Sequence, residues 1–533
     1  MNVASAPPAA AEPPAAASPG PGPGPGPTAA TAATATHGLP ARLSLTPVER
    51  FMLDDDRPSH PMTGIHELVV RGRLDDDLLA GALEAARRRH PLLCRIVDDS
   101  GREPVWVPAP ADMTVAVDRA PAGTPRTHPL GHWLDVRREI GLRVWVRDEE
   151  PDADGTPVCR LSAAVHHSVA DALGGITFLL DLFAHLSAAL GGVPVPAPPD
   201  PERVLHRGQL YEPSGLLPGL PKGRLGVWGH LLIGARRMKR TKTLPLAPGS
   251  RGKPVSAKPP PGADAEAAGV PPVDAVSPPR TVSFTEAETH GLRAAAKARG
   301  MTLNDLLLRD VFLTVREHNA RYDNAGATLD GSPAAVRINV PVNLRDEADL
   351  PAALRRSQSR GVRGGGLTVV NKIGMALVTR PTALADDPEA LLRSVHEEMS
   401  WVRQTERGRR FVEAVLLSYR LLKRPPGGMF DGTCYATAVL SNIGDLSRVI
   451  PPELRDERGR LHAPAADPAD ALTVTEYATG SPGRALTRAT VLAASYGGRL
   501  QLHLRTDPEE IAPEDAAAFS ADLAARVRRS AAG

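Results

Sequence analysis

Two proline-rich segments most limit what this chain of 533 residues can fold into. Residues 1–40 are almost entirely alanine, proline, glycine and threonine, and carry too little apolar bulk to form a core. Residues 194–279 have prolines crowded at both ends and a basic, partly apolar section between them. We therefore predict a disordered tail over 1–40, a linker over 194–279, and two folded units, 41–193 and 280–533, each long enough to bury its own core.

Composition excludes several classes of protein. The formal net charge of +2 gives no global electrostatic reason to expect nucleic-acid binding. The three cysteines, Cys94, Cys159 and Cys434, are scattered and odd in number, which argues against a disulfide framework and for a reducing compartment such as the cytoplasm. No stretch approaches the roughly 18 to 20 uninterrupted apolar residues that a membrane-spanning helix requires. The tail also lacks the charged start and leucine-rich core of a secretory signal.

Residues 142–190 predict a hairpin followed by a helix. Apolar residues alternate with others from Leu142 to Val146, a turn-rich run follows, and residues 158–165 form a second, largely apolar stretch. Beyond Asp171, apolar residues recur at helical spacing as far as Leu190. The hexapeptide 166–171 therefore lies between the end of a strand and the start of a helix.

The second unit also mixes helices and strands, so we predict an α/β or α+β sandwich in both units. Thr285 and Glu288 form a capping box, and Thr302 begins a second helix. Valines and Ile338 alternate along residues 336–342, although Pro341 favours an edge or an irregular ladder there. Further strands are predicted over 368–378, 434–441, 486–495 and 500–505, and helices over 388–405, 411–422 and 513–529.

The hexapeptide His166-His167-Ser168-Val169-Ala170-Asp171 is the best candidate for chemistry. A histidine titrates near pH 6.5 in water, so a neutral ring can take a proton from an alcohol, amine or thiol and return it later. A buried histidine that only hydrogen-bonds at a strand end is the alternative. A zinc or iron site is a further alternative, but adjacent histidines on a strand point to opposite faces and no second ligand cluster accompanies them, so we expect no metal.

This hexapeptide resembles the HHxxxDG signature of the CoA-dependent acyltransferase superfamily, which includes chloramphenicol acetyltransferase-like enzymes, condensation domains and wax ester synthase/diacylglycerol acyltransferases. Ala172 stands where the motif has its glycine. Other stretches are similar to the superfamily in the same order along the chain: His90 to Arg95, Arg337 to Arg345, Asn371 to Pro381, Ser441 to Gly444, and Ser495 to Leu500. The segment Ser441-Asn442-Ile443-Gly444 resembles the SN-x-G segment of the wax ester synthase/diacylglycerol acyltransferase branch, and the chain as a whole is most similar in pattern to that branch.

The resemblance implies two chloramphenicol acetyltransferase-like lobes with a central tunnel. It implies His167 as the general base, His166 in a supporting role, and Asp171 in a structural ion pair, for which Arg345 is our candidate partner. Ser441 and Asn442 are candidates for stabilising an oxyanion or positioning substrate.

The activity implied is transfer of an acyl group from acyl-CoA, or from a carrier-protein thioester, to an alcohol or amine acceptor such as a long-chain alcohol or diacylglycerol. Acyl-CoA would be a co-substrate, and no tightly bound cofactor is expected. Two alternatives stay open: a condensation-domain-like enzyme acting on carrier-bound substrates, and an inactive scaffold of the same fold, which Ala172 in place of glycine would favour.

Two basic segments have a separate interpretation. Residues 221–258 contain ten lysines and arginines but no acidic residue, and interleaved apolar residues include Trp228 and Leu231. Such a segment suits peripheral contact with anionic lipid, or else a basic linker that docks on the protein. The glycine-rich run 360–366 either contacts CoA phosphates or forms a solvated loop.

Overall fold

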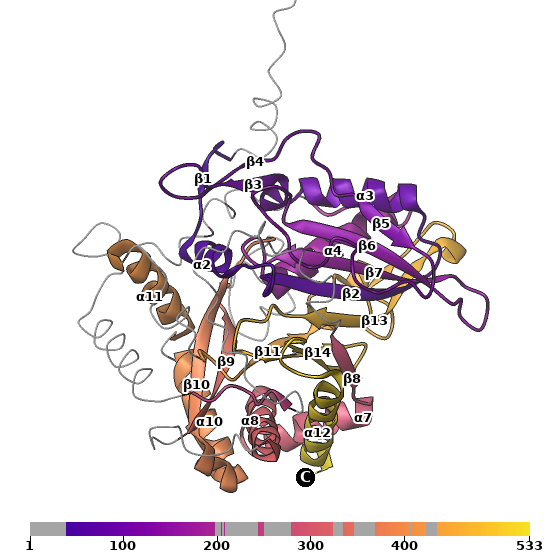
Figure 1. Cartoon of the computed structure of the whole chain (residues 1–533). Coiled ribbons are helices and arrows are strands. Elements are labelled where there is room, and N and C mark those ends of the chain that lie inside the picture. The colour runs from indigo at the N-terminus through magenta and orange to yellow at the C-terminus, as the bar shows by residue number, and fades with distance from the viewer. Residues whose placement is uncertain are drawn as a thin grey trace, which may run out of the picture.

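The computed structural model describes residues 39–197, 204, 207, 243–249, 279–322, 334–345, 368–404, 407–422 and 434–532. In this part of the chain, two lobes each contain a six-stranded sheet with helices packed against it (Figure 1). The predicted architecture of two mixed α/β lobes is therefore confirmed. The basic segment lies largely outside the described residues, as do the glycine-rich run and all of the predicted tail except Leu39 and Pro40.

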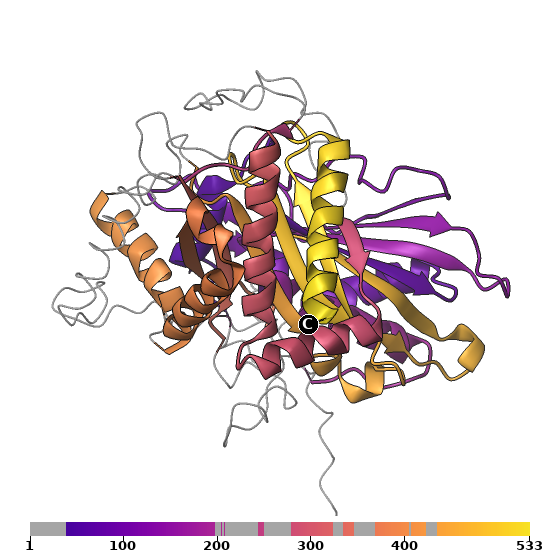
Figure 2. The same cartoon turned by 90° about the horizontal axis from the view of Figure 1, so that it is seen from below.

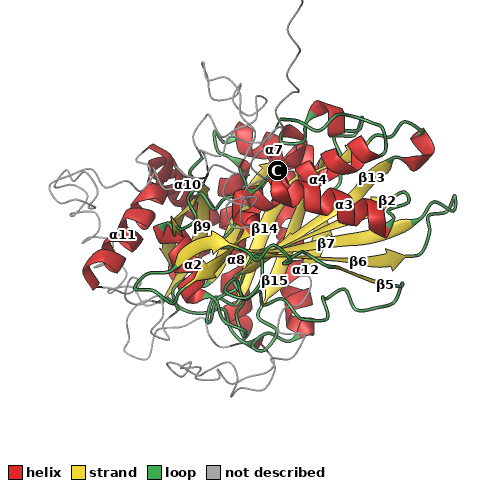
Figure 3. Ribbon diagram, turned by 90° about the horizontal axis from the view of Figure 1, so that it is seen from above, coloured by secondary structure: helices red, strands yellow, loops and turns green. Residues whose placement is uncertain are grey.

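The N-terminal lobe is built on a sheet with the strand order β12-β13-β2-β7-β6-β5. Helices α3 and α4 lie side by side across this sheet (Figure 3). A small second sheet has the order β1-β4-β3. The elements of this lobe in the first half of the chain are β1 (Leu43–Ser44), α2 (Pro47–Asp55), β2 (Thr63–Arg71), α3 (Asp76–Arg88), β3 (Arg95–Asp98), β4 (Val105–Pro108), β5 (Val117–Ala120), β6 (Leu142–Glu149), β7 (Val158–His166) and α4 (Ala172–Ala189).

The predicted hairpin before the histidines is present as β6 and β7, paired antiparallel. Alternate residues of the sheet, among them Leu68, Val144 and Leu161, face the helices and share a core with Leu79 and Phe183. Burying this face removes apolar area from water at about 25 cal/mol per Å². The packing fixes the end of β7 relative to α4, and that junction carries the histidine pair.

The C-terminal lobe has the strand order β10-β9-β11-β14-β15-β8. Helices α8 and α12 stand next to each other across its sheet, with α10 beside them (Figure 2). Both predicted helix starts are confirmed, each by a capping box, at Thr285 and Thr302. The elements are β8 (Arg280–Ser283), α7 (Glu286–Ala298), α8 (Leu303–Arg321), β9 (Ala335–Asn343), β10 (Ile373–Pro381), α10 (Pro388–Gln404), α11 (Arg407–Leu422), β11 (Ala438–Asp445), β14 (Ala489–Tyr496), β15 (Arg499–Thr506) and α12 (Pro513–Ala532).

The strands β9 and β11 diverge toward the lobe interface. Their parallel pairing covers only Ala438 with Ile338 and Val439 with Asn339, whereas β9 continues to pair with β10 as far as Asn343. The divergence lies next to Pro341, which has no N–H to donate, in agreement with the irregular ladder expected there. The predicted strand over 368–378 begins only at Ile373, because the residues before it bond to the other lobe.

The two lobes are not two consecutive pieces of chain. Strands β12 (His462–Ala463) and β13 (Leu472–Gly480), from the unit that we predicted over 280–533, complete the N-terminal sheet, where β13 pairs antiparallel with β2. Two parts of the predicted linker are also packed. Arg207 is buried against Glu49 at 2.6 Å, and Leu246 lies in the core of the C-terminal lobe.

A third apolar cluster joins the lobes. It contains Phe51 of α2, Met62 just before β2, Val412 and Val415 of α11, and Tyr435. The ring of Phe51 meets that of Phe411 edge-on at 5.8 Å between centroids. The cluster reaches Met62, whose backbone takes part in the site described below.

Helix α4 alone among the described helices is long and apolar enough to cross a membrane, with a mean hydropathy of 1.5. Of its residues, 67% are buried inside the protein. A core helix passes the same test of length and composition, and α4 packs in this way against α3 and the sheet.

Candidate active site

The turn between β7 and α4 is held by Asp171. Its Oδ1 accepts the N–H of Gly174 at 2.9 Å and caps the helix. Ala172 occupies the first position of α4, and among the described residues Leu486 is the only non-glycine residue with a positive φ. The alanine that replaces the motif's glycine is therefore unstrained. The backbone gives no reason to favour the inactive scaffold.

His166 is enclosed and has a structural environment. Its ring is 0% exposed, and Nδ1 accepts the backbone N–H of Ser168 at 3.1 Å. With Nδ1 as an acceptor, the ring carries a proton on Nε2, which lies 3.5 Å from Oδ2 of Asp56. Asp56 also accepts the N–H of Met62 at 2.7 Å. The histidine thus fixes the strand segment that precedes β2.

His167 is half-buried, whereas His166 beside it is fully enclosed. Its N–H donates to the carbonyl of Met62 at 2.7 Å, and its own carbonyl accepts from Nδ2 of Asn371 at 2.6 Å. Burial lowers the pKa of His167 below its ordinary value, although the charge of Asp171 acts in the opposite direction. The ring is therefore neutral at pH 7 and can accept a proton.

Asp171 and Arg345 form a bidentate ion pair across the lobe interface. The guanidinium nitrogens lie 2.6 Å and 2.8 Å from the carboxylate oxygens, and the two side chains are only 1% and 3% exposed. The structure thus places together the two residues that the sequence suggested as partners. Burial favours the neutral carboxyl, but the charge of Arg345 and several N–H donors outweigh it, so the pKa of Asp171 lies below its ordinary value.

His66 of β2 is a further buried histidine next to this turn. Its Nδ1 lies 2.9 Å from the hydroxyl of Tyr477, and its ring packs directly against the backbone of Gly175. Burial lowers the pKa of His66 to about 4, so the ring is neutral and adds no charge beside His167. No pattern in the sequence distinguishes this histidine from other buried residues of a strand.

Ser441 and Asn442 lie on β11, where that strand has left β9. Asn442 is exposed, and its Oδ1 accepts the N–H of Gly444. Within the described part of the chain, neither side chain hydrogen-bonds to the histidine pair. Their role with an oxyanion stays a prediction.

The described residues contain no group of three or more His, Cys, Asp or Glu side chains placed to hold a metal ion. His167 has Asn371 and Met62 as its hydrogen-bond partners, and neither offers it a carboxylate or a thiolate. This environment suits an acid–base group.

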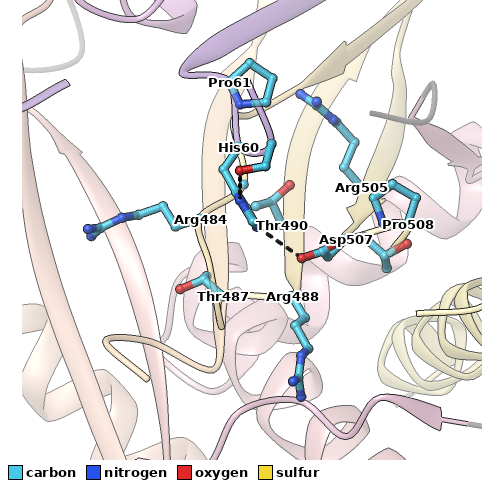
Figure 4. Close-up of a pocket in the computed structure, with 12 residues that line it drawn as sticks. His60, Pro61, Arg484, Thr487, Arg488, Thr490, Arg505, Asp507 and Pro508 are labelled. Atoms are coloured by element: carbon cyan, nitrogen blue, oxygen red, sulfur yellow. Dashed lines mark hydrogen bonds and ion pairs between the residues drawn. The ribbon is translucent and has the colours of Figure 1, made fainter. Parts of the chain in front are cut away.

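A small pocket lies at the lobe interface near Met62. It has a volume of about 30 Å³, which is room for one or two water molecules. His60 points toward Asp507, 3.2 Å away, while Arg484 and Arg488 point away from the centre (Figure 4). His167 does not line this pocket. The central tunnel stays a prediction.

Comparisons with known proteins agree with the fold. No protein-family model matches the chain. Two uncharacterized proteins of Mycobacterium tuberculosis, from strains CDC 1551 and H37Rv, are 25% identical over 488 residues, which cover 90% of this chain and 97% of each relative. The first condensation domain of the calcium-dependent antibiotic synthetase, in complex with a substrate analogue, has a TM-score of 0.58 at 16% identity and covers 92% of this chain and 97% of its own. The chain has the condensation-domain fold.

Two other solved structures of this fold are similar over nearly the whole chain. The starter condensation domain of rhizomide synthetase RzmA, as a mutant in complex with C8-CoA and Leu-SNAC, has a TM-score of 0.57 at 11% identity, covering 95% of this chain and 97% of its own. The trichothecene 15-O-acetyltransferase TRI3 of Fusarium sporotrichioides has a TM-score of 0.58 at 12% identity, covering 92% and 94%. Enzymes of condensation and of acyl transfer therefore share this architecture.

The sequence did not indicate Asn371 or Asp56 as parts of the site. Asn371 precedes β10 and Asp56 follows α2, and neither position belongs to a spacing pattern with the histidines. Asn371 bonds to a residue 204 positions away. Only a set of related sequences would have carried a signal for such a contact.

Proposed function

We propose that this protein transfers an acyl group from a CoA or carrier-protein thioester to an alcohol or amine. One observation carries the proposal. His167 is a neutral, half-buried histidine in a protein with the condensation-domain fold. Its backbone is hydrogen-bonded to the backbone of its own lobe and to a side chain of the other lobe. The RzmA domain with C8-CoA and the acetyltransferase from Fusarium support a thioester donor and an oxygen or nitrogen acceptor.

In the proposed reaction, His167 removes the proton of the acceptor hydroxyl or amine as that atom attacks the thioester carbon. A C–O or C–N bond forms and gives a tetrahedral intermediate. The C–S bond then breaks, and the imidazolium returns the proton to the leaving thiolate. No covalent enzyme intermediate and no tightly bound cofactor are needed.

Ser441 and Asn442 are the residues that we propose near the oxyanion. They lie where β11 is unpaired on the β9 side, which leaves polar groups of that strand available to a ligand. The resemblance of residues 441–444 to the wax ester synthase/diacylglycerol acyltransferase branch supports a long-chain alcohol or diacylglycerol as the acceptor. A carrier-bound amine is the acceptor if the protein acts as a condensation-domain-like enzyme.

The decisive experiment compares wild type with His167→Ala. Both are given acyl-CoA donors from acetyl to palmitoyl and a panel of long-chain alcohols, diacylglycerol and amines, and the released thiol is measured. We expect the rate to fall by about 10² to 10⁴, the usual contribution of a general base. His290→Ala is the matched control, because it removes an exposed imidazole of α7 and should leave the rate unchanged.

Two other outcomes would contradict parts of the proposal. Equal rates for wild type and His167→Ala would show that His167 is not the general base. Turnover only with a holo-carrier protein, and none with any acyl-CoA, would assign the protein to carrier-bound substrates.

A further inference from the structure

Asn371 is a buried amide that the proposed reaction does not use. It belongs to the C-terminal lobe, two residues before β10, and is 0% exposed. Its side chain nevertheless contacts His167 of the N-terminal lobe twice. A buried polar side chain aimed at the proposed base from the opposite lobe calls for a physical explanation.

The hydrogen bonds determine which way the amide faces. The N–H of Ile373 donates to Oδ1 of Asn371 at 3.3 Å, so Nδ2 is the atom turned toward His167. That nitrogen lies 2.6 Å from the carbonyl oxygen of His167 and 3.0 Å from Nδ1 of its ring. An amide nitrogen only donates, which makes the carbonyl its acceptor. Because the Nδ1 edge is covered, Nε2 is the ring nitrogen left for a substrate, and for Nε2 to act as the base Nδ1 must carry the proton of the neutral ring.

Asn371 is itself held by the ion pair. The carbonyl of Val370 accepts from Arg345 at 2.9 Å, and the N–H of Lys372 donates to Asp171 at 2.9 Å. Both neighbours of Asn371 are therefore tied to the Asp171–Arg345 pair. A continuous chain of contacts runs from the carboxylate, through the backbone around Asn371, to the imidazole.

We propose that Asn371 is a positioning residue that couples the Asp171–Arg345 ion pair to His167, orienting the ring and keeping it neutral. This inference rests on the proposed role of His167 as the base. The amide orients the ring because its nitrogen lies against the Nδ1 edge and donates to the carbonyl of the same residue. It keeps the ring neutral because the partial positive charge of the amide N–H group beside the ring opposes the imidazolium, and because a donor on the carbonyl weakens that oxygen as an acceptor for Nδ1–H.

Several other charged or titratable groups lie around the site of His167 and must be kept unchanged in any test. They are Asp171 at the start of α4, His166 on β7, His66 on β2, Arg345 after β9 and Lys372 before β10. Substitutions at position 371 leave all five in place. A change in the titration of His167 would then report on the amide itself.

The test uses the full chain with Asn371→Ala and Asn371→Asp, and Asn319→Ala as the control. Asn319 is a similarly buried amide, 2% exposed, that bonds to residues 245 and 247 away from the histidines. For Asn371→Ala we expect kcat to fall by about 10², the usual effect of a slightly misplaced catalytic group, with KM changed much less. For Asn319→Ala we expect wild-type kcat.

Titration provides a readout that does not depend on turnover. Protein with ¹⁵N-labelled histidine is titrated by NMR, and the His167 signals are identified by their loss in His167→Ala. The pKa of His167 should rise from wild type to Asn371→Ala, because a donor is lost and water enters. It should rise further in Asn371→Asp, because a carboxylate then favours the imidazolium.

Each outcome decides the inference. The expected order of pKa values together with the loss of kcat supports it. An unchanged His167 titration in Asn371→Ala overturns it, even if the variant is less stable. If His167→Ala is inactive but Asn371→Ala retains full kcat, the role of His167 as the base is supported and the positioning role of Asn371 is contradicted. If His167→Ala is fully active, the proposed function fails and the inference fails with it.

Discussion

At the scale of single residues, two adjacent histidines have opposite environments. The ring of His166 is enclosed by Ser168 and Asp56, whereas His167 keeps an accessible surface. Residues next to each other at the end of a strand point to opposite sides, so one ring enters the fold while the other faces the second lobe. This division explains how a single dipeptide can both stabilise the turn and supply the base that we propose.

The Asp171–Arg345 pair gives a stability prediction. Asp171→Ala leaves a buried guanidinium without its carboxylate, so the free energy of unfolding should fall by about 3–5 kcal/mol in urea denaturation. Asp75→Ala is the control. Asp75 also precedes a helix but makes no side-chain cap, and among the described residues it pairs only with exposed Arg73, so its loss should change stability by no more than about 0.5 kcal/mol.

The same pair predicts a pH dependence. The pKa of Asp171 in the folded protein lies below its ordinary value of 3.8, so its contribution to stability is complete above that value and is lost as pH falls through the folded pKa. Urea midpoints measured from pH 5 down to pH 2 should therefore decline less steeply in Asp171→Ala than in wild type. If the urea midpoints of both proteins declined in parallel, the carboxylate of Asp171 would contribute little to the pH dependence of stability.

Ala172 gives a prediction of a small effect on stability and none on kcat. Because it is the first residue of α4 and has no positive φ, restoring the motif's glycine should give no gain. We expect Ala172→Gly to lower stability by at most about 1 kcal/mol and to leave kcat unchanged. A clear rise in kcat would show that the alanine impairs the turn after all.

At the scale of elements, helix α4 approaches β2 closely because Gly175 has no side chain. A Cβ at this position would lie 2.2 Å from Nε2 of His66, whose ring is buried and bonded to Tyr477. Gly175→Ala should therefore destabilise the protein by about 1–3 kcal/mol through overpacking. In Gly81→Ala on α3, where nothing lies within 4 Å of the added Cβ, we expect a gain of about 0.5–1 kcal/mol. Thermal unfolding of the two variants measures both effects.

Local patterns predicted many of the elements and part of the site. The strand, turn and helix around His167, the capping box of α7 and the strands β14 and β15 all depend on neighbours in the chain. Asn371 and the pairing of β13 with β2 depend on contacts between distant residues, for which a single sequence carries no periodic signal. The ion pair was suggested by the family resemblance, and its bidentate geometry came only from the structure.

At the scale of the whole molecule, β13 makes the lobes interdependent. Without it, β2 would be an exposed nine-residue edge strand that invites association with other chains. We expect unfolding to be a single transition, with coincident curves from far-UV circular dichroism and from tryptophan fluorescence, to which Trp145 of one lobe and Trp401 of the other contribute. Two separated transitions would show that each lobe holds its structure alone.

The crossing of β12 and β13 also decides where chains of this kind can be spliced. A chimaera that joins residues 1–279 of one parent to the remainder of another sets a foreign β13 against β2, across a ladder that contains a bulge between Val474 and Glu476. Mismatched side chains there would disturb the strand whose first residue pairs with His166. A hybrid made to exchange substrate preference should therefore take residues 1–197 and residues 456–480 from the same parent. The whole sheet that carries His167 then comes from one protein.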